Sequence, residues 1–504
     1  MDPSTQGGAD ALALYRAEQV QELDRRAIAS GIAGFELMGR AGMAAFRCLQ
    51  QHWPQHSPIE IFCGGGNNGG DGYVVAALAA QAGMAVRVWA LSQQLRGDAA
   101  TAAELARDSG VDIHPWSGQQ PAPAAVIVDA LLGSGFHGAL RDDYAAAIAV
   151  INASACPVLA IDLPSGLSGD TGMHGGDAVR ASRTLSFIGW QRGLFTGVAA
   201  QYRGDLALDR LGLDASLYAG CQPSAWRIDA AARLREWGRR PQAAHKGMFG
   251  HVLVAGGDYG MAGAVILAAS AAARCGAGLI SCASRADHVP AILAQRPEVM
   301  AQPLSETADL SPFIDRASVL VVGPGLGQGD WGRRILDQCL AAEAPLLMDA
   351  DALNLLAAAP QAYLQRCLEQ PGRLRVMTPH PGEAARLLAC TVAELQADRF
   401  AACRALAQRY RAVVLLKGAG TVISDGEACW VNEGGNPGMA SGGMGDVLSG
   451  MIAALIAQGL DAAEACCLGA ALHCRAADRA AEAGQRGLLA MDVVAELRGV
   501  INDL

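Results

Sequence analysis

Residues 436–450 (NPGMASGGMGDVLSG) combine several glycines with one carboxylate, that of Asp446, directly before an apolar segment with helical spacing. Glycines let backbone N–H groups approach a ligand closely, and a helix N-terminus carries partial positive charge that suits a phosphate. A carboxylate beside such donors can accept the proton of a hydroxyl that attacks phosphorus. The stretch therefore indicates phosphoryl transfer with Asp446 as the base; a helix N-cap is the alternative interpretation of this aspartate.

Lysine is almost absent from the sequence. Of 39 basic residues only Lys246 and Lys417 are lysines, and both lie in glycine-rich segments, 245–247 (HKG) and 417–421 (KGAGT). Lysine and arginine are not equivalent where a compact point charge is required. Both lysines are therefore candidates for nucleotide or substrate contact, although chance retention would leave the same pattern.

Three polar loops follow predicted strands in the first half of the chain: residues 64–72 (GGGNNGGDG), 129–139 (DALLGSGFHGA) and 162–166 (DLPSG). The carboxyl ends of parallel strands meet at one edge of a sheet, where ligands bind. The first loop contains a G-x-G-x-x-G pattern, but the next strand lacks the acidic residue that binds a ribose, so we expect no hydride-transfer site. Either turn formation or an oxygen cage for a hard cation explains Asn68, Asp71, Asp129, Asp162 and Ser165.

The predicted strands of the second half also end in polar or glycine-rich turns, among them residues 323–327 (GPGLG) and 378–383 (TPHPGE). His380 lies between two prolines, which fits either a fixed functional orientation or a capping role. Asp349 and Asp351 follow a strand and suit a magnesium ion or a ribose, and a helix N-cap is equally plausible for Asp351.

Strands alternate with helices in both halves, which predicts an α/β fold with two doubly wound domains, residues 1–222 and 223–504. Residues 17–51 are expected to form helices broken near Gly31 and Gly34, and a helix is expected from residue 73 to 81. The predicted strands are residues 58–63, 85–91, 125–131, 158–163, 184–188, an edge strand from about residue 206, and then 250–255, 279–283, 318–322, 345–348, 375–377 and 413–416.

The composition is that of a globular enzyme: 504 residues, 51% hydrophobic and 17% charged. A net charge of -10 argues against nucleic acid as a partner. The cysteines are scattered without a CxxC pair, which indicates reduced thiols and no structural zinc. The N-terminus lacks a basic segment followed by an apolar one, so we expect a cytoplasmic protein with no membrane partner.

Six motifs in combination resemble the bifunctional NAD(P)H-hydrate repair enzymes over nearly the whole chain. They are NNGGDG at 67–72, DLPSG at 162–166, HKGMFGHVLVAGG at 245–257, TPHPGE at 378–383, KGAGT at 417–421 and GNPGMASGGMGDVLSG at 435–450. That family fuses an NAD(P)HX epimerase, a Rossmann-like three-layer sandwich, to an NAD(P)H-hydrate dehydratase of the ribokinase-like superfamily. The resemblance implies an isomerase and a lyase in one chain.

For the first domain the resemblance implies interconversion of the R and S epimers of hydrated NADH or NADPH. It implies that Asp162 is a substrate contact and a candidate base, and that Asn68, Asp129 and Ser165 bind K⁺. The substrate loops that it implies contain Asn67, Asn68, Gly69, Gly70, Asp71, Gly133, Ser134, Gly135, Phe136, His137, Gly138 and Ala139.

For the second domain the resemblance implies dehydration of the S epimer to NAD(P)H, with ADP as co-substrate, Mg²⁺ as cofactor, Asp446 as base, and AMP and phosphate as products. The residues themselves do not separate ADP from ATP. A homo-oligomer is also expected. The implied substrate-binding positions are Gly263, Ala264, Gly325, His380 and Asp446, and the implied nucleotide-binding positions are Lys417, Gly418, Ala419, Gly420, Thr421 and Gly445.

Two other functions fit parts of the sequence. An ATP-dependent small-molecule kinase of the ribokinase-like superfamily, fused to a ligand-binding domain, would use the same glycine loop and Asp446. A nucleotide-sensing or scaffold protein with one inactive domain is the alternative outside enzymes, and the presence of Asp446, Lys417 and Asp162 argues against it.

Overall fold

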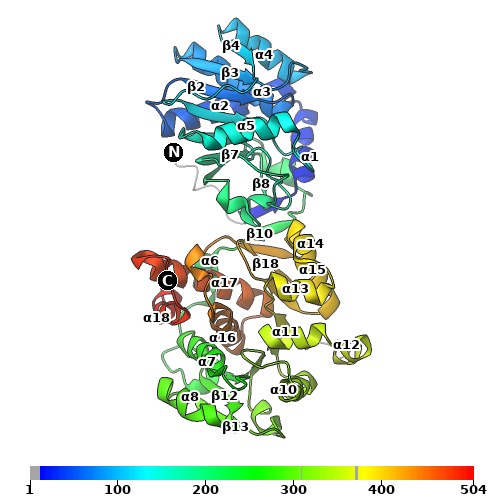
Figure 1. Cartoon of the computed structure of the whole chain (residues 1–504), viewed down its shortest axis with the longest axis vertical. Helices are drawn as coiled ribbons and strands as arrows, with labels where there is room; N and C mark the ends of the chain where they lie inside the picture. The colour runs from blue at the N-terminus through cyan, green and yellow to red at the C-terminus, as the bar shows by residue number, and fades with distance from the viewer. Residues whose placement is uncertain (1–11, 308, 369–372, 504) are drawn as a thin grey trace. The chain divides into compact units, whose positions relative to one another are not determined.

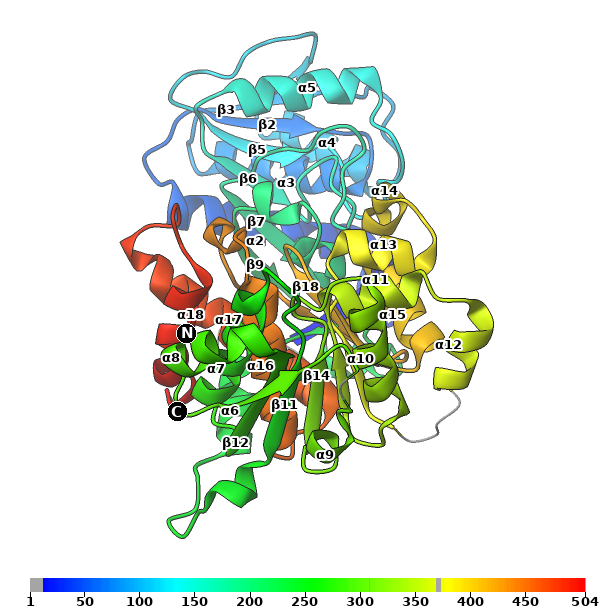
Figure 2. The same ribbon diagram turned by 60° about the horizontal axis from the view of Figure 1, so that its bottom comes forward.

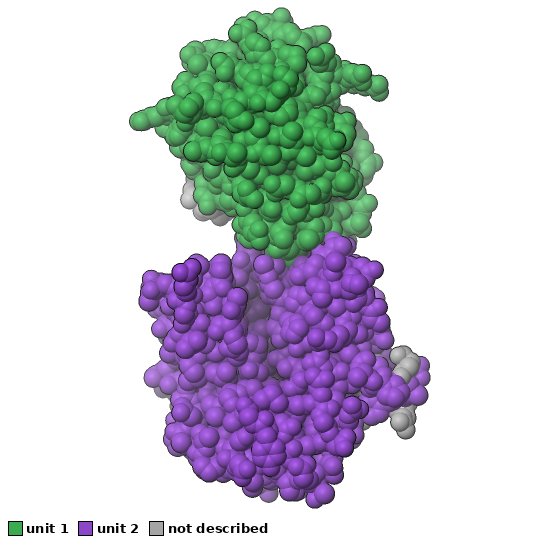
Figure 3. Space-filling model, viewed as in Figure 1, with its two compact units in different colours: residues 1–226 green, residues 227–504 purple. Residues whose placement is uncertain are grey.

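Apolar strands alternating with helices give each half of the chain its own parallel sheet (Figure 1). The structure, a computed structural model, describes residues 12–307, 309–368 and 373–503. The chain divides into two units, Met1–Trp226 and Arg227–Leu504, which Figure 3 colours separately.

The first unit contains a parallel sheet in the order β4-β3-β2-β5-β6-β7-β9. The order reverses between β2 and β5, and ligand sites in such sheets form at this reversal, beyond the carboxyl ends of the strands. The strands are β2 (Ile59–Cys63), β3 (Val86–Ala90), β4 (Asp112–Pro115), β5 (Val126–Ala130), β6 (Val158–Ile161), β7 (Arg183–Phe187) and β9 (Asp205–Asp209).

Helices cover both faces of this sheet because its strands alternate apolar side chains between two cores. Ile61 and Val128 belong to one core, which helices α2 and α3 complete, whereas Phe62 and Ile127 belong to the other, which α5 completes. The helices of this unit are α1 (Ala17–Ala29), α2 (Gly34–His52), α3 (Asn67–Gln81), α4 (Asp98–Asp108) and α5 (Asp142–Ala153), with short 3₁₀ turns η3 (Arg192–Phe195), η4 (Ala199–Gln201) and η5 (Ala215–Tyr218).

The start of α3 differs from the prediction. Residues 67–72 were expected in a loop before a helix from residue 73, but the helix begins at Asn67, after the extended N-cap Gly66. Glycine is needed there because of close approach: a Cβ on Gly69 would lie 2.1 Å from the Gly64 carbonyl oxygen, and one on Gly72 would lie 2.6 Å from the Ala130 Cβ. The glycines thus seat the helix on the strand ends.

Besides β4, three strands of two or three residues each were not predicted in this part of the chain. β1 (Ala13–Tyr15) runs parallel to β8 (Trp190–Gln191) and antiparallel to β10 (Ala225–Arg227), with Ala13 opposite Trp226. Strands of two or three residues carry too little periodicity to be recognised from sequence.

The second unit has strands in the order β13-β12-β11-β14-β15-β16-β17-β18-β19, parallel from β13 to β17 and antiparallel after it. The order reverses between β11 and β14. The strands are β11 (His251–Ala255), β12 (Leu279–Arg285), β13 (Met300–Leu304), β14 (Val319–Val322), β15 (Leu346–Met348), β16 (Arg375–Met377), β17 (Val413–Leu416), β18 (Thr421–Ser424) and β19 (Cys429–Asn432).

Helices lie on both faces of the second sheet as well. α7, α16, α17 and α18 lie on one side of the strands and α10, α11, α13 and α15 on the other (Figure 2). A Cβ on Gly450 of α16 would lie 2.0 Å from the Ala268 carbonyl oxygen of α7, so small residues let these two helices pack closely. The α-helices are α6 (Ala230–Trp237), α7 (Ala262–Arg274), α8 (Val289–Gln295), α9 (Ser311–Ile314), α10 (Asp330–Ala341), α11 (Ala350–Ala357), α12 (Gln361–Leu368), α13 (Pro381–Leu388), α14 (Val392–Ala397), α15 (Arg399–Tyr410), α16 (Met444–Ala457), α17 (Ala462–Ala480) and α18 (Ala490–Ile501).

Short 3₁₀ turns complete the second unit: η6 (Lys246–Phe249), η7 (Ala286–His288), η8 (Pro437–Met439) and η9 (Ala481–Ala483). Among the helices of the described residues, none has both the length and the apolar character needed to cross a bilayer.

Candidate active sites

A cavity of about 650 Å³ lies at the carboxyl ends of β2, β5 and β6 in the first unit. This is the edge where the strand order reverses, as expected for an open parallel sheet. Of the predicted substrate residues, those that line the cavity are Asn67, Asn68, Asp71, Gly133, Ser134, Gly135, Phe136, His137, Ala139 and Asp162. Gly69 and Gly70 instead hold α3 against its neighbours, and Gly138 is not part of the described lining.

Asp162 is held rigidly in this cavity. Its backbone has a positive φ of 66°, and its two carboxylate oxygens accept hydrogen bonds from the Ser134 N–H (2.9 Å) and the Gln191 side-chain amide (3.0 Å). Burial raises the pKa of Asp162 to about 6, although these two donors oppose the shift. A carboxylate with this pKa can exchange protons near neutral pH.

Asp71 lines the same cavity from the first turns of α3. Burial and the neighbouring carboxylates of Asp162 and Asp24 raise its pKa well above the usual range. Two carboxyl groups that share a site without a cation between them favour one protonated and one ionised form. The hydrogen bonds to Asp162 favour ionisation there, so Asp71 is the carboxyl group of the two that more readily holds a proton.

The three residues proposed to bind potassium lie at the ends of β5, β6 and the start of α3. The Ser165 hydroxyl donates to Asp129 Oδ1 at 2.5 Å, and the Ser165 N–H donates to Oδ2 at 2.8 Å. Both polar atoms of the Asn68 amide are buried without a hydrogen-bond partner, next to Gly133. A buried unpaired carbonyl oxygen is costly unless a ligand satisfies it, so these donors fit an oxygen-coordinated cation such as K⁺.

The opposite wall of this cavity was not predicted. It comes from α1 and α2, through Asp24, Leu37 and Met38, and from Asp98 at the start of α4. The helical period of residues 17–51 correctly predicts α1 and α2. It does not predict the cavity wall, because residues that pack in a core and residues that line a cavity show the same apolar spacing.

In the second unit, Asp446 lies in the first turn of α16. The N-cap is Gly443, at a positive φ of 88°, so the alternative that Asp446 caps the helix is wrong. Burial and the Asp349 carboxylate raise the pKa of Asp446 to about 7, while the Lys417 ammonium opposes the shift. Asp446 therefore has the proton affinity of a general base that works near neutral pH.

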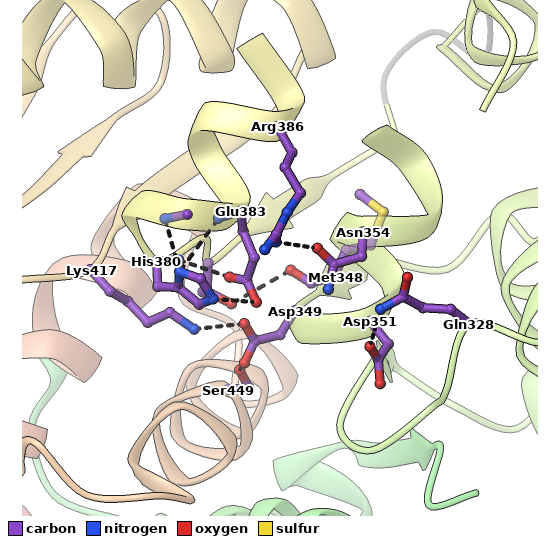
Figure 4. A network of polar contacts seen from close by, with 12 residues as sticks. Gln328, Met348, Asp349, Asp351, Asn354, His380, Glu383, Arg386, Lys417 and Ser449 are labelled. Atoms are coloured by element: carbon purple, nitrogen blue, oxygen red, sulfur yellow. Dashed lines mark hydrogen bonds and ion pairs between the residues drawn. The ribbon is translucent and has the colours of Figure 1, made fainter. Parts of the chain in front are cut away.

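Lys417, which is 20% exposed, and the buried Asp349 form an ion pair (Figure 4), and both charges act on the pKa of Asp446. The Lys417 Nζ lies 2.8 Å from Asp349 Oδ1, and the Ser449 hydroxyl donates to Oδ2 at 2.7 Å. Burial raises the pKa of Asp349, but Lys417 and these hydrogen bonds outweigh it and hold the pKa below its usual value. A Cβ on Gly445 would lie 3.1 Å from Lys417 Nζ, so the glycine backbone opens directly onto the ammonium group.

The TPHPGE segment closes the same site. His380 caps α13 by accepting hydrogen bonds at Nδ1 from the N–H groups of Gly382 (3.0 Å) and Glu383 (3.4 Å), so the capping role left open for it is confirmed. Burial raises the pKa of Glu383 to about 7 and lowers that of His380. The Lys417 N–H donates to the Pro379 carbonyl at 2.9 Å, which ties this segment to the KGAGT loop.

Asp351 is not a helix N-cap, since Asp349 occupies that position of α11. The Asp351 carboxylate instead accepts from the Gly327 N–H at 2.9 Å and so anchors the turn after β14. In that turn a Cβ on Gly325 would lie 3.2 Å from the Ala264 Cβ at the start of α7. Gly325 and Ala264, two of the predicted substrate positions, are thus neighbours.

Arg399 is a contributor that the sequence did not reveal. It is 1% exposed, and its guanidinium donates to the carbonyls of Leu416 (3.1 Å) and Lys417 (3.2 Å), directly beneath the start of the KGAGT loop. An arginine inside a helical segment gives no signal of this role. Lys246, in contrast, lies in η6, before the start of β11, and Asp446 lies in the first turn of α16.

The second site combines the Gly445 backbone with the Lys417 ammonium group, which suits a nucleotide phosphate. Among the described residues, no three His, Cys, Asp or Glu side chains are placed to hold a metal ion. Mg²⁺ that binds together with nucleotide phosphates needs only one or two protein carboxylates.

Comparison with known proteins covers both units. Residues 34–193 match the family described as YjeF-related protein N-terminus, and residues 252–498 match the NAD(P)H-hydrate dehydratase family. The bifunctional NAD(P)H-hydrate repair enzymes of Coxiella burnetii and Escherichia coli are 47% and 42% identical over 500 and 496 residues, covering 97% of this chain and 99% and 94% of theirs. A solved ribokinase-like superfamily protein from Enterococcus faecalis is 29% identical, with a TM-score of 0.50, over 55% of this chain and 95% of its own. These matches favour a repair enzyme over the small-molecule kinase that the sequence left open, and the chain belongs to the family of bifunctional NAD(P)H-hydrate repair enzymes.

Proposed function

We propose that this chain repairs hydrated nicotinamide cofactors in two steps. The N-terminal domain, residues 1–222, interconverts the R and S epimers of NAD(P)HX, and the C-terminal domain, residues 223–504, dehydrates the S epimer to NAD(P)H with ADP as phosphoryl donor. The observation that carries the second step is Asp446, with a pKa of about 7, beside the glycine backbone and the Lys417–Asp349 pair.

The dehydration step needs the hydroxyl of the hydrate to become a leaving group. Asp446 takes the hydroxyl proton while the oxygen attacks the β-phosphorus of ADP, and AMP departs. The N–H groups of the glycine loop and the Lys417 ammonium stabilise the charge that develops on phosphorus. Phosphate then leaves with the C–O bond electrons, and loss of a neighbouring ring proton restores the double bond. Mg²⁺, if bound with the nucleotide phosphates, would supply further charge neutralisation.

The epimerisation step needs an acid and a base in one cavity, because the hydroxyl must leave one face of the ring and water must return on the other. The ring nitrogen next to the hydroxyl-bearing carbon can supply electrons as the C–O bond breaks. Asp71, which more readily holds a proton, is suited to protonate the departing hydroxyl, and Asp162 is suited to take a proton from the incoming water. The substrate-loop residues 133–139 would hold the rest of the hydrate.

Potassium would serve the first domain through Asn68, Asp129 and Ser165. The unpaired Asn68 amide supports this proposal. We expect epimerisation to be faster in K⁺ than in Na⁺ at equal ionic strength, and we expect Asn68→Ala to remove the difference. Equal rates in both salts would discard the cation site.

The experiment that tests the function uses the full chain with hydrated NADH and either ADP or ATP. We expect the absorbance of reduced nicotinamide to appear together with one AMP per NADH formed from ADP. Formation of NADH without nucleotide consumption, or phosphorylated product without NADH, would contradict the proposal. The ATP arm decides the nucleotide preference through the product, ADP or AMP.

A further inference from the structure

A second cavity, of about 870 Å³, lies in the second unit near the C-terminal ends of α7 and α16. Asp446 is in the first turn of α16 and Gln458 follows its last turn, so a helix rise of 1.5 Å per residue separates them by about 18 Å. The other walls are the segment 237–241 at the end of α6, the end of α18, and Phe249 of η6. Figure 2 labels these helices. The HKGMF segment, which the catalytic site does not use, thus contributes to this cavity.

The cavity is strongly basic in an acidic protein. Its lining contains Arg239, Arg240, Arg274 and Arg498, and none of its described lining residues is acidic. The whole chain carries a net charge of -10, so this concentration of positive charge runs against the overall balance. Clefts lined by one sign of charge attract small ions of the opposite sign.

Helix C-termini attract arginines, which is the plainest explanation for basic residues at this place. That explanation accounts for Arg240, which donates to the Gly276 carbonyl and to Gln458 Oε1 (3.0 Å) and stacks 3.7 Å from the Phe249 ring centre. Gln458 in turn satisfies the Cys275 carbonyl at 3.0 Å.

Arg274 and Arg498 lie in the last turns of α7 and α18, where the helix dipole also favours a positive charge, but their guanidinium groups, like that of Arg239, lack the contacts that Arg240 makes. Arg239, Arg274 and Arg498 form no side-chain hydrogen bond or ion pair with any residue in the described parts of the chain. Guanidinium groups match phosphate oxygens in pairs of parallel hydrogen bonds, which makes arginine the usual residue for phosphate recognition. The Trp237 side chain adds an apolar wall on which a flat ring could lie.

We propose that this cavity is a second binding site, separate from the catalytic one, for a small phosphate-bearing anion. The site would draw the anion by the three free guanidinium groups and hold it between α7, α16 and α18. A nucleotide and an inorganic phosphate share this chemistry, and the test distinguishes them. The inference does not depend on the proposed reaction, since the lining shares no residue with the catalytic site.

The test is equilibrium binding of ADP, AMP and pyrophosphate, each titrated separately into the full chain at low salt and fitted to two sites, because the catalytic site is itself proposed to bind ADP. The pocket variant is Arg274→Ser/Arg498→Ser. The matched control is Arg333→Ser/Arg334→Ser, which removes two exposed arginines from α10, outside the cavity lining. Wild type and control should bind at least one of the three probes at a site that the pocket variant weakens by at least about tenfold. That binding should weaken as salt is added.

The dehydration kcat and the KM for ADP should be the same in all three proteins, because the catalytic site is untouched. Binding of pyrophosphate as tight as that of ADP would identify phosphate itself as the recognised group, and binding of the nucleotides alone would identify the nucleotide. Equal binding of every probe to wild type and pocket variant, or an equal loss in the control, would overturn the proposal.

Discussion

Asp446 owes its chemistry to its neighbours rather than to its own type. A carboxyl group on the surface loses its proton well below neutral pH, so at neutral pH it is a weak base. Burial and the adjacent Asp349 carboxylate raise the pKa of Asp446 to about 7. Lys417 prevents a larger shift, because it pairs with Asp349 and its ammonium charge also favours the ionised form of Asp446. The three side chains therefore act as one unit.

We expect Asp446→Asn to lower kcat for dehydration by about 10²- to 10⁴-fold, since the substitution keeps the shape of the side chain but removes the base. In the wild-type chain the active form is the ionised one, so kcat should fall as pH drops through about 7 and level off above it. Steady-state kinetics across this pH range measure both effects. Asp330→Asn, which removes an exposed first-turn carboxylate from α10, is the control and should leave kcat unchanged.

A second prediction concerns the stability of the Lys417–Asp349 pair. Lys417→Met leaves the Asp349 carboxylate buried at 1% exposure without its partner, which should lower the free energy of unfolding by about 3 kcal/mol. Since the pKa of Asp349 is held below its usual value, the stabilisation is present above the unfolded-state pKa and is lost as pH falls through the lowered one. Urea denaturation at several pH values measures it.

The companion variant Lys417→Met/Asp349→Asn removes both charges and should recover part of the lost stability. An unchanged denaturation midpoint for Lys417→Met alone would mean that the pair does not stabilise the second unit.

At the scale of elements, the start of α16 depends on one glycine and not on its neighbour. Gly443 has a positive φ of 88°, and a Cβ there would lie 2.5 Å from Leu267 Cδ1, whereas a Cβ on Gly442 would meet no atom within 4 Å. We expect Gly443→Ala to displace the first turn of α16, destabilise the unit by about 1–3 kcal/mol and reduce dehydration. Gly442→Ala should retain the stability of the wild type. Thermal melts and dehydration assays of the two variants test this prediction. Equal melting temperatures for Gly443→Ala and Gly442→Ala would contradict it.

The helices and strands also show how much of the fold could be predicted from the sequence. β16 and β17 coincide with the predicted strands because short apolar runs ended by turn residues allow few alternatives. The start of α3 was missed because glycines normally argue against a helix. Here close contacts require them, with Gly64 just after β2 and with Ala130 of β5, which is distant in sequence. The polar strand ends gave the candidate residues, but the partners of those residues could not be predicted. The buried Arg399 beneath the KGAGT loop and the wall of α1 and α2 depend on tertiary packing alone.

At the scale of the whole molecule, each unit carries its own candidate site on its own sheet. The first unit has the cavity that Asp71 and Asp162 line, and the second has the Lys417–Asp349 ion pair. Asp162→Asn should therefore abolish epimerisation and spare dehydration of the S epimer, and Asp446→Asn should do the reverse. A mixture of the two variants should convert the R epimer to NADH, because the epimer released by one chain can bind the other. Neither variant alone should do so faster than spontaneous epimerisation allows. Progress curves with pure R epimer measure this, and a mixture no faster than its components would show that both sites must belong to one chain.

The scarcity of lysine gives the chain an uncommon chemical handle. Lys417 is committed to Asp349 within the second unit, whereas Lys246 is exposed on η6. Reagents for primary amines therefore find, apart from the chain terminus, essentially one reactive side chain in a protein of 504 residues. A fluorophore or a solid support could be attached at Lys246 in a single orientation, without engineering a cysteine.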